Sequence, residues 1–234
     1  MKTESKKIKV SRVCENSLMV YFGETIDTRL VDKIAVFTHA VQQQFQGALE
    51  EVIPSYTSVF IAYHPLKADP DQLVHWCQQQ AEQVLTLSEV SSAAKVVSLP
   101  VYYHPEVAPD LQALAQARQL TVDEVIEIHS QTEYTVCAIG FAPGFAFLGS
   151  VDPRITMPRH AEPRMKVAKG SVGIADSQTA VYPLDTPGGW QIIGNCPVEL
   201  FNMTHEPMMP FEVGDKIRFQ PMTREAFLAS GGSL

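Results

Sequence analysis

The sequence has little cysteine and no long apolar run. Its four cysteines form no C-x-x-C pair, which is typical of buried thiols in a reducing compartment rather than of disulfides or a zinc site. The longest aliphatic or aromatic run, residues 59–63, has the length of a strand and is too short to span a membrane. No apolar segment of signal-peptide length follows the charged first residues. We therefore expect a cytoplasmic protein with no membrane partner. The cysteines are Cys14, Cys77, Cys137 and Cys196.

Positive charge is also scarce, and this excludes one class of partner. Lysine and arginine number 18 against 26 aspartates and glutamates, so the formal net charge is −8. Because phosphate backbones are bound through basic surfaces, we expect no general nucleic-acid binding. The chain also lacks G-x-x-x-x-G-K-[ST], G-x-S-x-G and H-E-x-x-H. It therefore has no standard phosphate loop and no complete catalytic apparatus of its own, and we predict no metal site.

The first part of the chain alternates between short strands and two helices. The helix predicted over residues 27–45 carries an apolar stripe at steps of three or four residues. A second helix begins at Asp69-Pro70, where Asp can cap the helix and Pro fits its first turn. Strands are predicted at residues 7–13, 17–22, 50–54, 58–63 and 95–101. Without the first strand, the order is β-α-β-β-α-β, which predicts a ferredoxin-like α+β domain over residues 1–97.

The second part changes from helical to strand periodicity. Thr121 and Glu124 have the spacing of a capping box, which predicts a helix after them. Residues 140–197 hold eight of the 13 glycines and seven of the 16 prolines, with short β-rich pieces between them. Many short strands with frequent turns favour a barrel or sandwich. We expect a mainly β domain with a short helical insert over residues 98–234.

The segment 140–149 reads GFAPGFAFLG and has two interpretations. Glycine allows close approaches, proline stiffens the backbone, and the aromatic rings supply flat apolar walls. The segment is either a tightly turned core loop or a pocket rim or partner-docking loop.

A local excess of positive charge follows. Residues 150–170 contain five lysines and arginines against two acids, a local charge of +3 in an acidic chain. The planar fork of arginine suits carboxylate and phosphate oxygens, and the alternative is a solvated basic face. We favour an anion site in which Arg159, Arg164 and Lys166 hold substrate oxygens, and we place Arg164 with the catalytic residues.

Further candidates lie on either side of this segment. His129 is the best general acid–base candidate, because it lies near the end of the capped helix, although a buried packing role is the alternative. Gln178 and Thr179 either orient an amide or carboxylate substrate or have a generic surface role. The turn at Gly189 and Trp190 either binds an oxyanion through backbone amides or forms a barrel corner.

These motifs, taken in order, resemble one family. They are GFAPGF (140–145), DPR (152–154), PR (163–164), GSVGIA (170–175), QT (178–179), YP (182–183), PGGW (187–190) and IG (193–194). The chain is similar to the family that holds the B-type subunit of 5-oxoprolinase, allophanate hydrolase subunit 1 and the KipI-type inhibitors of sensor histidine kinases. The likeness extends more loosely through Pro109-Asp110-Leu111 and residues 124–129.

The resemblance implies a ferredoxin-like domain followed by a cyclophilin-like β-barrel. It also implies a partner, a second cyclophilin-like subunit of the 5-oxoprolinase C type, with the site between the two. A third protein of the LamB/YcsF type, the A component, would complete an ATP-dependent 5-oxoprolinase, with ATP used at the level of the complex.

The sequence departs from the family pattern at three places. Asp176 stands where a glycine is common, Asn195-Cys196 replaces a common Arg-Thr, and YYHPE at residues 102–106 lacks an expected glycine. The first two changes bear on substrate identity more than on fold.

The leading hypothesis from the resemblance is conversion of 5-oxo-L-proline to L-glutamate, with Gln178 recognising the lactam. The alternatives are inhibition of a histidine kinase and a role as an allophanate hydrolase or urea carboxyltransferase-like subunit.

Overall fold

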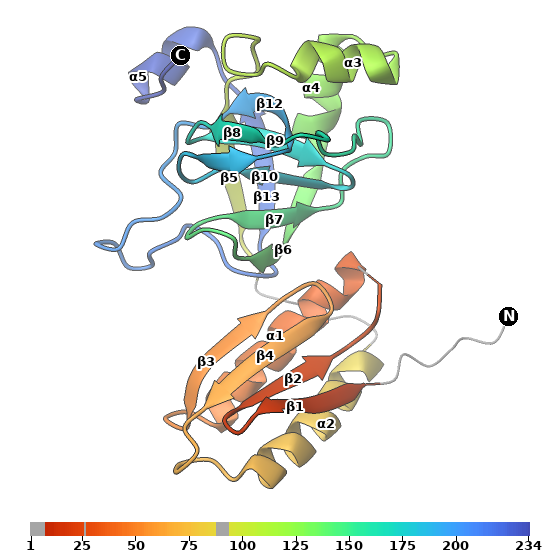
Figure 1. Cartoon of the computed structure of the whole chain (residues 1–234), viewed down its shortest axis with the longest axis vertical. Coiled ribbons are helices and arrows are strands. Elements are labelled where there is room, and N and C mark those ends of the chain that lie inside the picture. The colour runs from red at the N-terminus through yellow and green to blue at the C-terminus, as the bar shows by residue number, and fades with distance from the viewer. Residues whose placement is uncertain (1–7, 26, 88–93) are drawn as a thin grey trace, which may run out of the picture. The chain divides into compact units, whose positions relative to one another are not determined.

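The computed structural model describes residues 8–25, 27–87 and 94–234. It divides the chain into two compact units, Met1–Ala93 and Ala94–Leu234 (Figure 1). Within the described residues, no helix is both long enough and apolar enough to cross a membrane.

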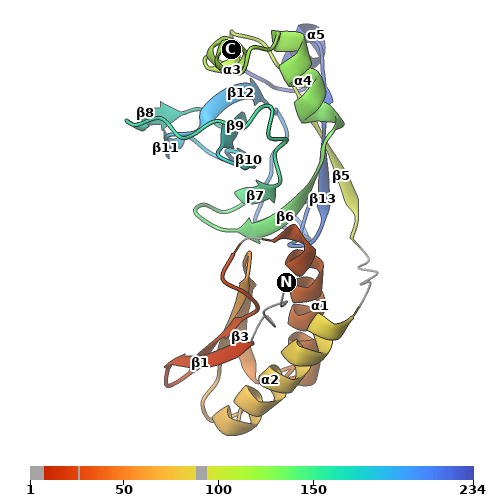
Figure 2. The same ribbon diagram turned by 90° about the vertical axis from the view of Figure 1, so that its right-hand side faces the viewer.

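The first unit is a four-stranded antiparallel sheet with two helices on one face (Figure 2). Its strand order is β1-β2-β4-β3. The elements are β1 (Lys9–Cys14), β2 (Ser17–Tyr21), α1 (Thr28–Gln44), β3 (Leu49–Pro54), β4 (Ser58–Tyr63) and α2 (Pro70–Thr86).

Local sequence explains why these helices form where they do. The side chains of Asp27 and Asp69 accept hydrogen bonds from backbone amides at the starts of α1 and α2. The predicted stripe of α1 is buried at Leu30, Ile34, Phe37 and Val41. Both predicted helices are therefore confirmed, each to within a few residues.

The predicted strand order of this unit was wrong in one respect. The fifth strand, β5 (Val96–Val101), pairs in parallel with β13 (Lys216–Pro221) of the second unit. The first strand, β1, occupies the sheet edge beside β2, where a ferredoxin-like order would place the last strand. The predicted boundary between residues 97 and 98 thus falls inside β5. The reason is that β5 buries Leu99 and Val101 in the core of the second unit, and an apolar pattern does not say which sheet a strand joins.

The second unit contains a nearly closed seven-stranded sheet with the order β12-β9-β10-β7-β6-β13-β5. Two backbone hydrogen bonds between Tyr102, just after β5, and Asn195, at the end of β12, join its edges at 2.8 and 3.0 Å. A two-stranded ribbon, β8 with β11, and three helices complete the unit. The remaining elements are α3 (Leu111–Arg118), α4 (Val122–Gln131), β6 (Glu133–Ile139), β7 (Ala146–Gly149), β8 (Arg164–Val167), β9 (Ser171–Ala175), β10 (Gln178–Val181), β11 (Thr186–Gly188), β12 (Gln191–Asn195) and α5 (Arg224–Ala229).

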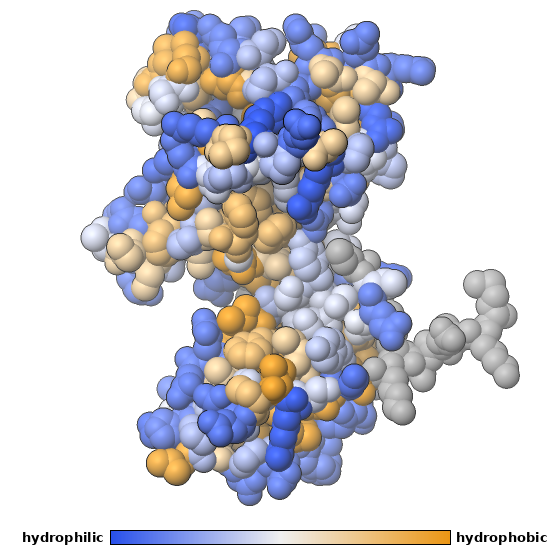
Figure 3. Space-filling model, viewed as in Figure 1, coloured by the Kyte–Doolittle hydropathy of each residue, from blue (hydrophilic) through white to orange (hydrophobic). Residues whose placement is uncertain are grey.

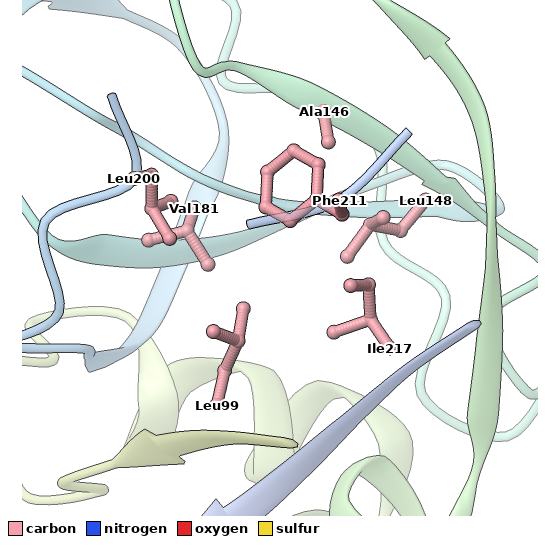
Figure 4. A pocket seen from close by; sticks show the side chains of 7 residues that line it. All are labelled: Leu99, Ala146, Leu148, Val181, Leu200, Phe211 and Ile217. Carbon is pink, nitrogen blue, oxygen red and sulfur yellow. The ribbon is translucent and has the colours of Figure 1, made fainter. Parts of the chain in front are cut away.

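Side chains fill the interior of this barrel. Figure 4 shows seven apolar side chains facing a gap between the strands that leaves no room for a water molecule. They are Leu99, Ala146, Leu148, Val181, Leu200, Phe211 and Ile217. This part of the interior is therefore a packed core.

Candidate functional site

The five cations of residues 150–170 differ in their partners. Four of them face carboxylates: Arg154–Asp152 at 2.8 Å, Arg164–Asp110 at 2.5 Å, Lys166–Asp185 at 2.7 Å and Lys169–Glu199 at 3.6 Å. Arg159 forms no ion pair with any carboxylate of the described residues, and its guanidinium carbon lies 5.6 Å from the centroid of the Trp190 ring. Three acids from other segments, Asp110, Asp185 and Glu199, therefore match the predicted excess of +3. Arg159 is the cation of this segment that is left to bind a ligand.

Asp110 is a buried carboxylate that joins three segments. Its Oδ1 accepts a hydrogen bond from Arg164 Nη2 at 2.5 Å, and its Oδ2 accepts one from the backbone N–H of Ile192 at 2.6 Å. Arg164 Nη1 also donates to the backbone oxygen of Trp190 at 3.3 Å. Arg164 keeps 32% of its side chain exposed, so it can approach a ligand while Asp110 holds it.

The loop that carries Arg159 is tied to residues 189–192 by further hydrogen bonds. The side-chain nitrogen of Gln191 donates to the backbone oxygen of Pro158 at 2.8 Å. The backbone N–H of His160 donates to the oxygen of Gly189 at 2.7 Å. Together with the bonds through Asp110 and Arg164, these contacts fix the loop on both sides of Arg159.

Trp190, over which Arg159 lies, belongs to an aromatic cluster. Phe145, Phe147 and Tyr182 lie within 6.4 Å of its ring, centroid to centroid, and Trp190 itself is buried. Phe141 packs edge-on against Phe145 at 5.2 Å and is 66% exposed. Figure 3 shows apolar residues gathered on the second unit over the region of β7.

The loop at 140–145 is held in a conformation that constrains its residues. Phe141 has a φ of 71°, in the left-handed region that non-glycine residues seldom adopt. Gly144 has a φ of 84°, and an added Cβ would lie 2.9 Å from the Cβ of Phe201. The loop is thus packed closely against Leu200 and Phe201, yet the ring of Phe141 is exposed to solvent.

Gly188 makes room for the hydroxyl of Tyr182. A Cβ at Gly188 would lie 2.5 Å from Tyr182 Oη. Burial raises the pKa of Tyr182 above its ordinary value, so the phenol keeps its proton at neutral pH.

His129 is enclosed by the protein. No part of it is exposed, and its ring stacks on Phe219 at 4.6 Å. Thr179 Oγ1 donates its hydrogen to the backbone oxygen of Gly173, so it must accept a hydrogen from His129 Nε2 at 3.0 Å. His129 Nδ1 then accepts from the hydroxyl of Tyr103 at 2.7 Å. Burial lowers the pKa of His129 to about 3, and the neutral imidazole fits both hydrogen bonds.

The predicted site residues therefore fall into separate groups. Arg159, Arg164, Gly189 and Trp190 lie together. His129 and Thr179 contact each other inside the protein, where no ligand reaches them in this structure. Exposed Lys166 pairs with Asp185, and half-buried Gln178 lies at the β7–β10 and β9–β10 pairings. A catalytic role for His129 stays a prediction, and it would require the packing around the ring to open.

Sequence reasoning did not assign roles to Asp110, Gln191 or Tyr182. The signal for Asp110 was its place in the family-like stretch at residues 109–111, but nothing local pairs it with an arginine 54 positions away. The departure at Asp176 is accommodated by the turn, because its φ of 52° is one that aspartate tolerates better than most residues do. Among the described residues, no group of three or more His, Cys, Asp or Glu side chains is placed to hold a metal ion.

Comparison with known proteins places this arrangement in a family. The model of the carboxyltransferase domain, subdomain C and D, matches residues 8–211. The chain belongs to this family. It is 33% identical to the B-type subunit of 5-oxoprolinase from Bacillus subtilis, over 95% of this chain and 96% of that protein. The predicted family is therefore confirmed.

Solved structures agree with the fold. The crystal structure of the protein TTHA0988 superposes with a TM-score of 0.77 at 28% identity, over 88% of this chain. This chain spans 40% of the length of TTHA0988. The urea amidolyase of K. lactis superposes with a TM-score of 0.75 over 97% of this chain and 16% of its own, and at 17% identity it shows the fold alone.

Proposed function

We propose that this chain is the B-type subunit of an ATP-dependent 5-oxoprolinase, which opens 5-oxo-L-proline to L-glutamate together with partner subunits. The observation that carries the proposal is the match to the B. subtilis protein of that name over nearly the full length of both chains. The match includes the segments that build the Arg159–Trp190 site.

The geometry fits a small anionic amide. Arg159, which is exposed, lies over the Trp190 ring and has no carboxylate partner among the described residues, suits the carboxylate of 5-oxoproline. The lactam is a resonance-stabilised amide that opens slowly by itself. Coupling the ring opening to ATP hydrolysis is therefore chemically reasonable. Phosphate placed on the amide oxygen would make a better electrophile.

The proposal includes partners and a cellular location. Because the sequence has no phosphate loop, we assign ATP to the complex rather than to this chain. The partners would be a second cyclophilin-like subunit of the C type and a LamB/YcsF-type A component, in the cytoplasm. We also propose that the barrel is of the cyclophilin-like type and that the first unit is a ferredoxin-like variant in which β1 takes the place of the last strand.

The test is reconstitution. Co-expressed with its two partners, the chain should support ATP hydrolysis that depends on 5-oxoproline. Replacing Arg159 by alanine should lower kcat/KM by about ten- to a hundredfold, the effect of losing a hydrogen bond to a charged group.

Arg154→Ala is the matched control, since Arg154 is an exposed arginine already paired with Asp152 and should change kcat/KM less than twofold. An inactive complex of folded wild-type subunits would refute the function. Equal activities of the two arginine variants would refute the role of Arg159.

One observation favours a second candidate, inhibition of a sensor histidine kinase. Phe141 is an exposed aromatic residue held at a strained φ, as expected of a docking residue. In that case the isolated chain should inhibit kinase autophosphorylation, and Phe141→Ser should abolish the inhibition. Two results together would exclude this candidate. The Phe141→Ser complex would turn over 5-oxoproline normally, and the isolated chain would have no effect on kinase autophosphorylation.

A further inference from the structure

The contacts around Arg159 point to a residue that acts on the site without touching the ligand. Four consecutive residues, 189–192, each form a hydrogen bond that holds the Arg159 loop or its anchor. Gly189 and Gln191 bind the loop directly. Trp190 and Ile192 bind it through the Arg164–Asp110 pair.

Asp110 contributes to this set from a third segment, the one that precedes α3. It is also the most deeply buried charge of the set, with 8% of its side chain exposed. Its Oδ1 lies 2.5 Å from Arg164 Nη2 and 3.3 Å from His160 Nε2, and its Oδ2 accepts a hydrogen bond from the amide of Ile192 at 2.6 Å. A carboxylate bound to both partners fixes the distance between the loop's end and the strand that follows Trp190.

Helix capping does not explain Asp110. It occupies the N-cap position of α3, yet its side chain makes no capping hydrogen bond there. Its carboxylate instead spans 54 residues to Arg164 and 82 to Ile192. An N-cap aspartate normally bonds the first free amides of its own helix, so this one serves the loop instead.

We infer that Asp110 is a positioning residue, which neutralises and anchors Arg164 so that Arg159 is held over Trp190 as the cation that recognises the substrate carboxylate. This inference rests on the proposed function for the identity of the substrate. It divides the two arginines between tasks: Arg164 holds the loop, and Arg159 selects an anionic ligand.

The first test is kinetic and uses Asp110→Asn in the reconstituted complex. A carboxylate bound equally in the ground state and transition state contributes to KM and not to kcat. Asp110→Asn should therefore raise KM for 5-oxoproline about tenfold and change kcat less than twofold. KM for the carboxamide analogue of 5-oxoproline, which has no carboxylate, should stay unchanged. A merely destabilised subunit would lower kcat for both compounds and leave both KM values alone.

Asp185→Asn is the matched control, because it breaks a lysine–carboxylate pair at the same ribbon without touching the Arg159 loop. It should leave all four constants within twofold. If Asp110→Asn prevents folding, Arg164→Lys is used instead, since it keeps the charge and loses the two-pronged contact to Asp110 and Trp190. Unchanged KM for 5-oxoproline in the folded variant would overturn the inference.

The second test needs no activity. The chain has two tryptophans, so in a Trp76→Phe background the emission reports Trp190 alone. Asp110→Asn should change this emission in the same direction as Arg159→Ala, because both remove the guanidinium from the ring, and Asp185→Asn should not. Emission equal to that of the parent would overturn the positioning role. An inactive wild-type complex with the expected fluorescence result would refute the proposed function and leave the role of Asp110 standing.

Discussion

At the scale of single residues, the hydrogen bonds of His129 define its protonation state. Its Nε2 must donate to Thr179, because the hydroxyl hydrogen of Thr179 is committed to the backbone of Gly173. A second ring proton would remove the acceptor that Tyr103 uses and would place a charge in a fully buried position. The residue is thus a neutral link between α4 and the barrel strands β9 and β10.

This predicts how stability responds to acid. Burial lowers the pKa of His129 in the folded state from 6.5 to about 3. Between these values the unfolded chain binds the proton and the folded chain does not, so stability falls as the pH falls from 6.5 toward 3. The slope from this one residue approaches about 1.4 kcal/mol per pH unit.

Chemical denaturation of wild type and His129→Gln from pH 8 to pH 4 measures the effect. The variant should be less stable at pH 8 by about 1–3 kcal/mol, since glutamine replaces the hydrogen bonds imperfectly. Its stability should also fall less steeply below pH 6.5. Parallel pH curves for the two proteins would show that His129 is not the group responsible.

At the scale of elements, the ribbon of β8 and β11 must lie close to the barrel for the site to form. Gly188 of β11 pairs with Arg164 of β8, and the same glycine faces the hydroxyl of Tyr182, just after β10. A side chain at position 188 would therefore displace the ribbon and Arg164 with it.

Gly188→Ala should lower the free energy of unfolding by about 1–3 kcal/mol, as overpacking does, and should also weaken 5-oxoproline turnover. Removing the hydroxyl, in Gly188→Ala with Tyr182→Phe, should restore part of the stability, because Oη is the closest atom to the new methyl group. Thermal unfolding of both single variants and the double variant completes the cycle. Strictly additive effects of the two substitutions would contradict this contact.

The same scale shows what local sequence could predict. The caps at Asp69 and Thr121 and the stripe of α1 depend on neighbours within one or two turns, and all three are confirmed. The partners of β5 and of Arg164 depend on chain segments far away in sequence. The surplus of positive charge over residues 150–170 is visible in the sequence, but Asp110, Asp185 and Glu199 have to be brought together by the fold before Arg159 can be singled out.

At the scale of the whole molecule, β5 decides where the second unit begins. It pairs with β13 over six positions, from Val96–Lys216 to Val101–Pro221, and residue 102 then closes the barrel against Asn195. The strand buries Leu99 and Val101 in the core of the second unit. A division of the chain at residue 97 would cut this strand.

Two fragments test this. Residues 94–234 keep all the strands of the barrel and should unfold in one cooperative transition. Residues 102–234 lack β5, which exposes one edge of β13 and the apolar core beside it, so this fragment should show no cooperative transition and should aggregate. Calorimetry and size-exclusion chromatography distinguish the two results. A cooperative transition in the shorter fragment would mean that the remaining six strands form a stable sheet by themselves. The second unit would then not require β5 in order to fold.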